Sequence, residues 1–385
     1  MLAQLQHQLA QRAQAGLLRH RRVLSGAQQP LMQLDGQSLL GFASNDYLGL
    51  AHHPKLIQAI QQASAQAGVG AGASHLINGH HQMHHDYEQA MAHFLGFERG
   101  LLFSTGYMAN LGIVQALLDR QDAVFADKLN HACLNDAALL SRAELRRYPH
   151  QDLQALDKLL GKSQARRKLV AVDAVFSMDG DMVDLPRLLE ICQRHDAYLL
   201  LDDAHGFGVL GEQGRGTLSH FKLHSPRIIY MATLGKAAGV SGAFVVADQT
   251  IVDYLVQFAH TYIYTTATPP ALAAALMASL EVMQQAPERQ QHLHQLIAYL
   301  KQQLKLKRWQ LMPSDTAIQP LLVGDNATVL ALSDYLRQAG IFVPAIRPPT
   351  VPDNTARLRI SLSAAHSQAQ VDQLIEALQQ AEKVI

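Results

Sequence analysis

An aspartate and a lysine, each close to the end of an apolar segment, are the residues of this sequence best suited to chemistry. Asp202 follows the apolar run 197–201, and Lys236 comes shortly after the run 227–232. Such runs predict buried strands of a parallel sheet. A lysine amine forms imines with carbonyl compounds, and a buried carboxylate keeps a heteroaromatic nitrogen protonated. The pair therefore indicates pyridoxal 5′-phosphate as cofactor, although an aspartate at a strand end also caps helices or binds Mg²⁺.

Hydroxyl and backbone groups near other predicted strand ends could hold the phosphate of this cofactor. The segment 104–110, Ser-Thr-Gly-Tyr-Met-Ala-Asn, follows a strand and opens a helix. The backbone amides of Gly106 and Tyr107 would then point at an anion, but an ordinary Ser/Thr N-cap explains the same pattern. Thr233 lies three residues before Lys236 and could reach the same phosphate. Ser177 follows another strand and could reach the cofactor ring.

Two histidines could address the ring itself. His205 is three residues beyond Asp202, so both side chains could face one ring, the acid at the nitrogen and the imidazole at the phenolic oxygen. His131 follows a strand and could stack on the ring face. It could equally be a histidine without function at a helix start. Asp203 is expected to cap or brace its loop.

Composition excludes several classes of protein. The 385 residues contain 32 Lys plus Arg and 32 Asp plus Glu, so no global charge favours nucleic acid or a membrane. Cys133 and Cys192 are expected to be buried thiols without a disulfide. No signal peptide or membrane span is evident, so we expect a soluble, cytoplasmic protein. The histidines at 80, 81, 84 and 85 could bind zinc, but no cysteine or acid pair accompanies them, and no metal is expected.

The order of predicted elements indicates an α/β fold. A helix is expected over 1–24, a hairpin over 31–42 turning at Asp35-Gly36, and a helix over 54–67, before the glycine-dense segment 68–74. Over 84–250, helices alternate with strands such as 100–103, 123–126, 168–172 and 198–201, which predicts a mainly parallel sheet covered on both faces. The arginines at 142, 146 and 147 are expected on a solvated helix face.

Three domains are expected along the chain. They are an N-terminal helix and hairpin segment (1–40), a large cofactor-binding domain (41–285) and a small C-terminal α+β domain (286–385). A long helix begins at Pro270 and ends at Gln285, a hinge follows at 286–288, and a strand is expected at 357–362.

Five ordered motifs together resemble those of the α-oxoamine synthases, pyridoxal-phosphate enzymes of the aspartate aminotransferase fold (fold type I). They are Ser-Asn-Asp-Tyr-Leu-Gly at 44–49, Phe-Ser-Met-Asp-Gly-Asp at 176–181, Asp-Asp-Ala-His at 202–205, Gly-Glu-Gln-Gly-Arg-Gly at 211–216 and Thr-Leu-Gly-Lys at 233–236. The resemblance runs from about residue 15 to the end. One departure is Val-Asp-Ala at 172–174, where many relatives have threonine, an acid and glycine; the acid remains.

The resemblance implies a role for each matching residue. Lys236 would form the imine, Asp202 would pair with the ring nitrogen, His205 with the phenolic oxygen, and His131 would stack on the ring. These four residues would be catalytic. The cofactor cradle would be completed by Ser177, Thr233, Gly106 and Tyr107. Thr265 or Thr266 would reach the phosphate of the neighbouring subunit, which implies a homodimer. The substrates would be bound by Asn45 and Arg359 at the amino-acid carboxylate, and by Arg19, Thr350 and Arg347 at the acyl group.

Within the family, Ile-Arg-Pro-Pro-Thr-Val-Pro at 346–352 and Leu-Leu-Arg-His-Arg-Arg at 17–22 are most similar to members that make a biotin precursor. These join L-alanine to a pimeloyl thioester, of coenzyme A or of a carrier protein, with loss of CO₂. A glycine-using relative such as glycine C-acetyltransferase is the nearest alternative. Two alternatives from other functional classes agree less well with the sequence. One is a non-catalytic cofactor-binding protein. The other is a nucleotide hydrolase with Asp202 and Asp203 as metal ligands, which ranks last because no phosphate loop is present.

Overall fold

The computed structural model describes residues 1–14 and 17–385, and a seven-stranded sheet forms its centre. The strand order is β4-β10-β9-β8-β7-β5-β6. The strands are β4 (Arg99–Phe103), β5 (Ala123–Asp127), β6 (Glu144–Tyr148), β7 (Lys168–Asp173), β8 (Tyr198–Asp202), β9 (Ile228–Thr233) and β10 (Ala243–Ala247). Neighbours from β9 to β6 pair in parallel, and β10 is antiparallel to both β9 and β4. The mainly parallel sheet is confirmed.

Both faces of this sheet are buried, as the apolar strand sequences require. Alternate residues of β8 enter two separate cores: Leu199 and Leu201 on one face, Leu200 on the other. One face carries α3 (Gln82–Leu95), α6 (Leu153–Gly161), α7 (Leu185–Arg194), α8 (Thr217–His220) and α11 (Pro270–Gln285). The other carries α4 (Gly106–Leu117), α5 (Ala132–Ser141), α9 (Gln249–Phe258) and α10 (His260–Ile263). The carboxyl ends of the strands remain for a site.

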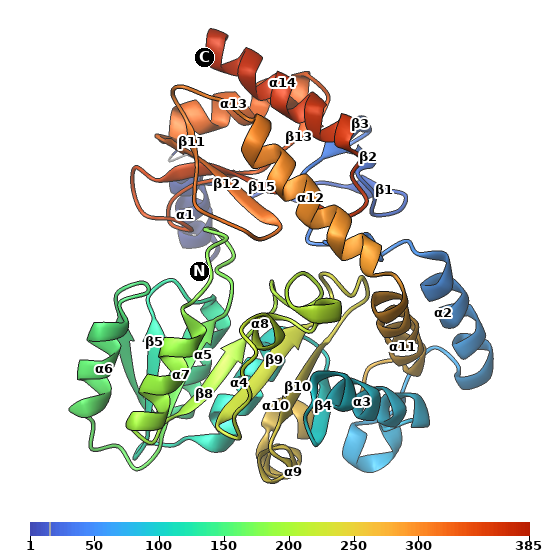
Figure 1. The fold of residues 1–385 in the computed structure, drawn as a ribbon, viewed down its shortest axis with the longest axis vertical. Helices are drawn as coiled ribbons and strands as arrows, with labels where there is room; N and C mark the ends of the chain where they lie inside the picture. Colours follow the sequence, from blue (N-terminus) through green and yellow to red (C-terminus); the bar gives the residue numbers. More distant parts are fainter. Residues whose placement is uncertain (15–16) are drawn as a thin grey trace.

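The C-terminal residues build a smaller antiparallel sheet, in the order β11-β12-β15-β14, and three helices. The strands are β11 (Gln310–Leu311), β12 (Ile318–Gly324), β14 (Ala345–Ile346) and β15 (Ala356–Ser361), and the helices are α12 (Pro287–Gln303), α13 (Asn326–Gln338) and α14 (Gln368–Val384). In Figure 1 these elements lie together at the top, with the large sheet below them. The expected α/β fold with a smaller α+β part is therefore confirmed.

The N-terminal hairpin belongs spatially to this smaller part. Strands β1 (Leu24–Ser25), β2 (Leu31–Leu34) and β3 (Gln37–Gly41) form a sheet with β13 (Ile341–Phe342), which pairs with β3 in parallel. Figure 1 shows the blue hairpin beside the red C-terminal helix α14. The turn at Asp35-Gly36 and helix α2 (Pro54–Ala67) are as expected. The three domain boundaries stay a prediction.

Two local expectations were wrong. The first helix, α1 (Leu2–Gln14), is shorter than 1–24 and none of its residues is buried; residues 15 and 16 of that range lie outside the described residues. The chain is extended by residue 24 because Leu24 pairs with Leu34 of β2. The arginines at 146 and 147 lie on the edge strand β6, not on a helix. Over the described residues, no helix is long and apolar enough to cross a membrane.

Candidate active site

Three neighbouring strands end in polar residues that the sheet register places side by side. Asp173 ends β7, Asp202 ends β8 and Thr233 ends β9. Asp173 is the register partner of Asp202, and Asp202 is the partner of Met231 on β9. Both carboxylates are buried. Because parallel strands bring their carboxyl ends to one edge, these residues meet at the sheet edge where the sequence places the candidate site.

Lys236 lies in the turn between β9 and β10, and its side chain is directed into this site. Its Nζ lies 2.9 Å from Nε2 of His205. Burial lowers the pKa of Lys236, while the charges of Asp202 and Asp173 act in the opposite direction. The turn requires glycine at 239, where φ is +71° and a Cβ would lie 2.6 Å from the carbonyl carbon of Leu50. Lys236 is therefore half-buried, in a turn whose shape depends on Gly239.

A chain of hydrogen bonds leads from Lys236 to Arg359. Burial and the nearby Lys236 charge keep the pKa of His205 well below its usual value. Because the Lys236 ammonium donates to Nε2, the proton of the neutral ring is on Nδ1, which donates to the Tyr47 hydroxyl at 2.6 Å. Tyr47 in turn donates to Oδ1 of Asn45 at 3.1 Å. Sequence reasoning missed Tyr47, although it lies within the motif 44–49.

Arg359 is anchored so that its guanidinium faces Oδ1 of Asn45. Nη1 and Nη2 each lie 3.2 Å from Oδ1 of Asn45, and Nε donates to the Ser177 carbonyl at 2.6 Å. The Ser361 hydroxyl accepts from Nη1 at 2.9 Å. Arg359 is only 6% exposed. The predicted pair Asn45 and Arg359 is therefore brought together, and a buried guanidinium whose hydrogen-bond partners here are neutral oxygens suits a carboxylate ligand.

Asp202 is held by one side chain and one backbone amide. Asn110 donates from Nδ2 to Oδ2 of Asp202 at 2.7 Å, and the Ala204 amide donates to Oδ1 at 3.1 Å. Burial raises the pKa of Asp202, and the Lys236 charge counteracts this. A buried carboxylate facing a lysine needs a cationic partner to remain ionised. Asn110 is a further residue that sequence reasoning did not single out.

The opposite end of the site fits a phosphate group. Helix α4 begins at Gly106, and Thr105 caps it by accepting from the Met108 amide at 3.1 Å. The Thr233 Oγ1 atom is buried without a hydrogen-bond partner among the described residues. A Cβ at position 106 would lie 2.5 Å from Cγ2 of Thr233, so only glycine leaves this space open. The site therefore has an unpartnered hydroxyl beside a helix N-terminus at one end and Asp202 at the other. This arrangement fits the phosphate and the ring nitrogen of pyridoxal phosphate.

His131 is the N-cap of α5, at the edge of the same site. Its backbone amide donates to Oδ2 of Asp173 at 2.6 Å, and its Nδ1 accepts from the Cys133 amide at 3.3 Å. The imidazole is exposed toward solvent. Burial and the neighbouring Asp202 charge raise the pKa of Asp173 well above its usual range. The helix-start placement is as expected, and the stacking role stays a prediction.

Other predicted residues lie outside this hydrogen-bonded group. Thr266 is exposed and bridges to Ser74, next to the half-buried Thr265. Arg19 is exposed in the segment before β1. Thr350 is exposed in the loop between β14 and β15, where its amide donates to the Arg347 carbonyl at 3.0 Å. Their roles toward a partner subunit and an acyl substrate stay predictions.

The loop that carries Ser177 is fixed by the half-buried His150. His150 Nδ1 lies 3.1 Å from Oδ1 of Asp127, its Nε2 lies 2.9 Å from Oδ2 of Asp181, and its ring packs edge-on against Phe176. Burial alone would lower the pKa of His150, but the hydrogen bonds and charges of both aspartates outweigh it and raise the pKa to about 10. The imidazolium therefore ties the loop to the end of β5.

Replacing His150 with glutamine should destabilise the protein by about 2 kcal/mol at pH 7, because the buried Asp127 and the half-buried Asp181 lose their cation. A raised histidine pKa stabilises the fold fully below the unfolded value near 6.5, and this stabilisation is lost as pH rises through about 10. Denaturant unfolding at pH 6, 8 and 10 should show the difference shrinking with pH. His195→Gln, at a pair with the more exposed Asp157, is the control. A His150→Gln difference that is constant from pH 6 to 10 would contradict the assignment.

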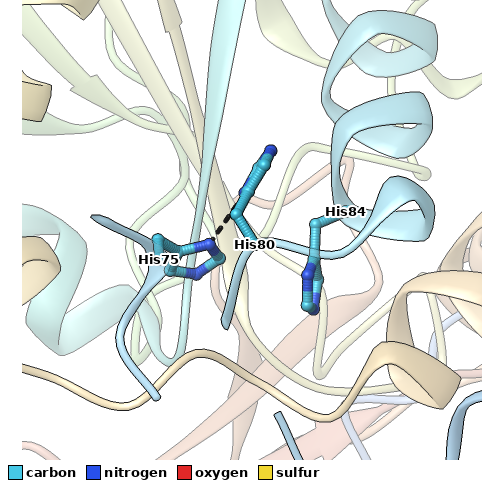
Figure 2. Close-up of side chains that lie close together, drawn as sticks. All are labelled: His75, His80 and His84. Atoms are coloured by element: carbon cyan, nitrogen blue, oxygen red, sulfur yellow. Dashed lines mark hydrogen bonds between the residues drawn. The ribbon is translucent and has the colours of Figure 1, made fainter. Parts of the chain in front are cut away.

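Three histidines, His75, His80 and His84, lie close together near the start of α3, with potential ligand atoms within 4.8 Å of one another (Figure 2). His84 accepts from the His81 amide at Nδ1 (3.0 Å) and its Nε2 lies 2.8 Å from the Thr268 carbonyl. His75 and His80 share a hydrogen bond of 2.9 Å between their Nδ1 atoms. Burial lowers the pKa of both His75 and His84 to about 4. In this arrangement His84 has no lone pair left for a metal ion.

Comparison with known proteins identifies close relatives. The family model of class I and II aminotransferases matches residues 37–378. The 8-amino-7-oxononanoate synthase of Methylobacillus flagellatus is 58% identical over 383 residues, which cover 100% of this chain and 97% of that protein. The solved 8-amino-7-oxononanoate synthase of Francisella tularensis is 32% identical with a TM-score of 0.78, over 90% of this chain and 98% of that one. A serine palmitoyltransferase from S. paucimobilis, solved with bound PLP, is 28% identical with a TM-score of 0.92, over 98% and 96%.

Proposed function

We propose, on the premise that this chain belongs to the aminotransferase class I and II family, that it joins L-alanine to a pimeloyl thioester with loss of CO₂. The products are 8-amino-7-oxononanoate, CO₂ and the free thiol, a step of biotin biosynthesis. The chain is a pyridoxal-phosphate-dependent C-acyltransferase. The observation that carries the proposal is the half-buried Lys236, just after β9, beside the buried Asp202 at the end of β8, in a chain 58% identical to such a synthase.

The cofactor supplies electron withdrawal from the α-carbon of an amino acid attached to it. Asp202 would pair with the ring nitrogen of the bound cofactor and would keep a proton on it, because a buried carboxylate strongly favours a charged partner. Lys236 would hold the cofactor, and its amine would be the base that takes the α-proton of alanine. Burial lowers the pKa of Lys236, which makes its neutral, basic form more accessible. His205 holds the amine in place through its Nε2 atom.

Arg359 and Asn45 bind and orient the carboxylate of alanine. The guanidinium is already held by the Ser177 carbonyl and the Ser361 hydroxyl, so it needs little reorganisation to receive a substrate oxygen. Arg19, Arg347 and Thr350 bind the acyl donor, whose pimeloyl end carries a carboxylate. The donor is a thioester of coenzyme A or of a carrier protein.

The enzyme works as a homodimer in the cytoplasm, with Thr265 or Thr266 reaching the phosphate of the partner subunit. Three large apolar side chains support this proposal. Val69 is 83% exposed, and Ile77 and Tyr264 are each 78% exposed. The segments that carry Ile77 and Tyr264 are neighbours, because Thr266 bridges to Ser74. Exposed apolar groups of this size on adjacent segments are typical of a subunit interface.

An assay of the purified, cofactor-loaded protein against a panel of acyl thioesters tests the substrates. Free thiol and CO₂ should form with L-alanine and pimeloyl thioesters, and glycine with acetyl thioester should be at least about tenfold slower, because each misfit in an acyl pocket costs a factor of this order. Turnover of glycine and acetyl thioester at a rate equal to or above that of alanine would favour a glycine C-acetyltransferase instead. Pimeloyl-coenzyme A and pimeloyl-carrier protein are compared in separate reactions.

A further inference from the structure

We propose that Asn110 and Cys133 are positioning residues, which hold His131 as the tautomer protonated at Nε2 and connect it to Asp202 through one continuous chain of hydrogen bonds. The proposal rests on the proposed function, since His131 and Asp202 are both expected to contact the cofactor. It gives a role to Cys133, which sequence reasoning treats as an inert buried thiol.

The tautomer follows from the donors around Nδ1 of His131. The backbone amide of Cys133 lies 3.3 Å from this atom, and an amide can only donate. At 3.3 Å this bond is weak, so by itself it favours, without fixing, a lone pair on Nδ1 and the ring proton on Nε2. The Cys133 Sγ atom lies 2.9 Å from the same Nδ1. With an acceptor opposite it, the thiol has to donate its proton, and it reinforces the same tautomer.

Asn110 completes the chain on the other side of the thiol. Its Nδ2 group donates one hydrogen to Oδ2 of Asp202 at 2.7 Å and the other to Sγ of Cys133 at 3.1 Å. Asn110 is fully buried, and its Oδ1 atom has no partner among the described residues. Exchanging the amide oxygen and nitrogen would set an oxygen against the carboxylate, so the amide orientation is fixed by Asp202.

The thiol remains protonated in this setting. Burial and the Asp202 charge raise the pKa of Cys133 far above its usual value. Cys133 is therefore a hydrogen-bond donor and not a nucleophile. The consequence for the reaction is that His131 presents an N–H group on its free edge. That group can donate to a substrate carbonyl or carboxylate oxygen, and it cannot remove a proton there.

The experiment compares Cys133→Ala, Cys133→Ser and the control Cys192→Ala, which removes the other buried thiol. Histidine ¹⁵N NMR of the cofactor-free protein reads the tautomer, with the His131 signal assigned by its loss in His131→Asn. The wild type and Cys133→Ser should show protonated Nε2. Cys133→Ala should shift toward a mixture, and its dissociation constant for pyridoxal phosphate should rise about fivefold, the size expected for one neutral hydrogen bond. Cys192→Ala should match the wild type.

Two results would overturn the assignment. One is a Cys133→Ala protein with wild-type His131 signals and wild-type cofactor affinity; the other is a folded Cys133→Ser protein that behaves like Cys133→Ala. Asn110→Ala tests the connection to Asp202: it should weaken cofactor binding and also shift the His131 signal, and a change in affinity alone would contradict a continuous chain. A wild-type protein that binds no pyridoxal phosphate would instead refute the proposed function, because the tautomer is read without cofactor.

Discussion

Replacing Lys236 with alanine should abolish the visible absorbance of the cofactor-loaded protein and lower turnover by at least about a thousandfold, or about 4 kcal/mol of activation free energy. Lys236 is half-buried, and its Nζ atom lies 2.9 Å from Nε2 of His205. The variant loses both the covalent anchor and the base. Absorbance spectra and a thiol-release assay measure the two effects.

Borohydride reduction followed by mass spectrometry locates the attachment. In the wild type the peptide containing Lys236 should gain the mass of the reduced cofactor, and in Lys236→Ala no peptide should. The matched control is Lys158→Ala, an exposed lysine on α6, which should keep the spectrum and the rate. A Lys236→Ala protein that turns over alanine at the wild-type rate would refute the role given to this lysine.

Replacing Asp202 with asparagine should lower turnover on the order of a thousandfold while the fold is retained. Asparagine has nearly the same shape, but it is neutral and cannot keep a proton on the ring nitrogen. The amide oxygen can still accept from Asn110, whereas the NH₂ group would face the Ala204 amide, so the variant keeps its shape and loses one hydrogen bond. The cofactor dissociation constant should rise as well, which a spectroscopic titration of the cofactor-free protein measures.

The neighbouring carboxylate provides the control. Asp203 accepts from the Tyr230 hydroxyl and the Thr217 amide, each at 2.7 Å, and burial raises its pKa to about 7. Asp203→Asn should lower the thermal midpoint with little effect on turnover, because this side chain braces the loop and does not face Lys236. Equal losses of turnover in the two variants would show that the charge of Asp202 has no special role.

The sequence predicts the parts of the site that follow directly from strand ends. Asp202, Thr233 and Lys236 come after apolar runs long enough to identify as strands, so their meeting at one sheet edge could be expected. Tyr47 and Asn110 could not be assigned in the same way. Each contacts a residue far along the chain, His205 and Asp202 respectively, and a tyrosine or asparagine in a loop or helix has many ordinary uses.

In the fold, too, elements with a clear local pattern were predictable and elements that depend on tertiary contacts were not. Long apolar strands such as β7 and β8 were predictable, whereas β6, Glu-Leu-Arg-Arg-Tyr, is an edge strand whose charged residues resemble a helix surface. The helix expected over 1–24 was too long because the pairing of Leu24 with Leu34 is a tertiary constraint. The antiparallel strand β10 follows the predicted site closely and was not identified, although its sequence Ala-Phe-Val-Val-Ala is apolar throughout.

The bond between Asn45 and Arg359 joins residues 314 positions apart, and strand β3 near the start of the chain pairs with β13 near its end. Almost the entire polypeptide must therefore leave the ribosome before the carboxylate pocket can form. During synthesis the large sheet can form first, since all its strands lie between residues 99 and 247. The nascent chain thus acquires the carboxylate pocket last. Translation products that end before Arg359 lack this pocket.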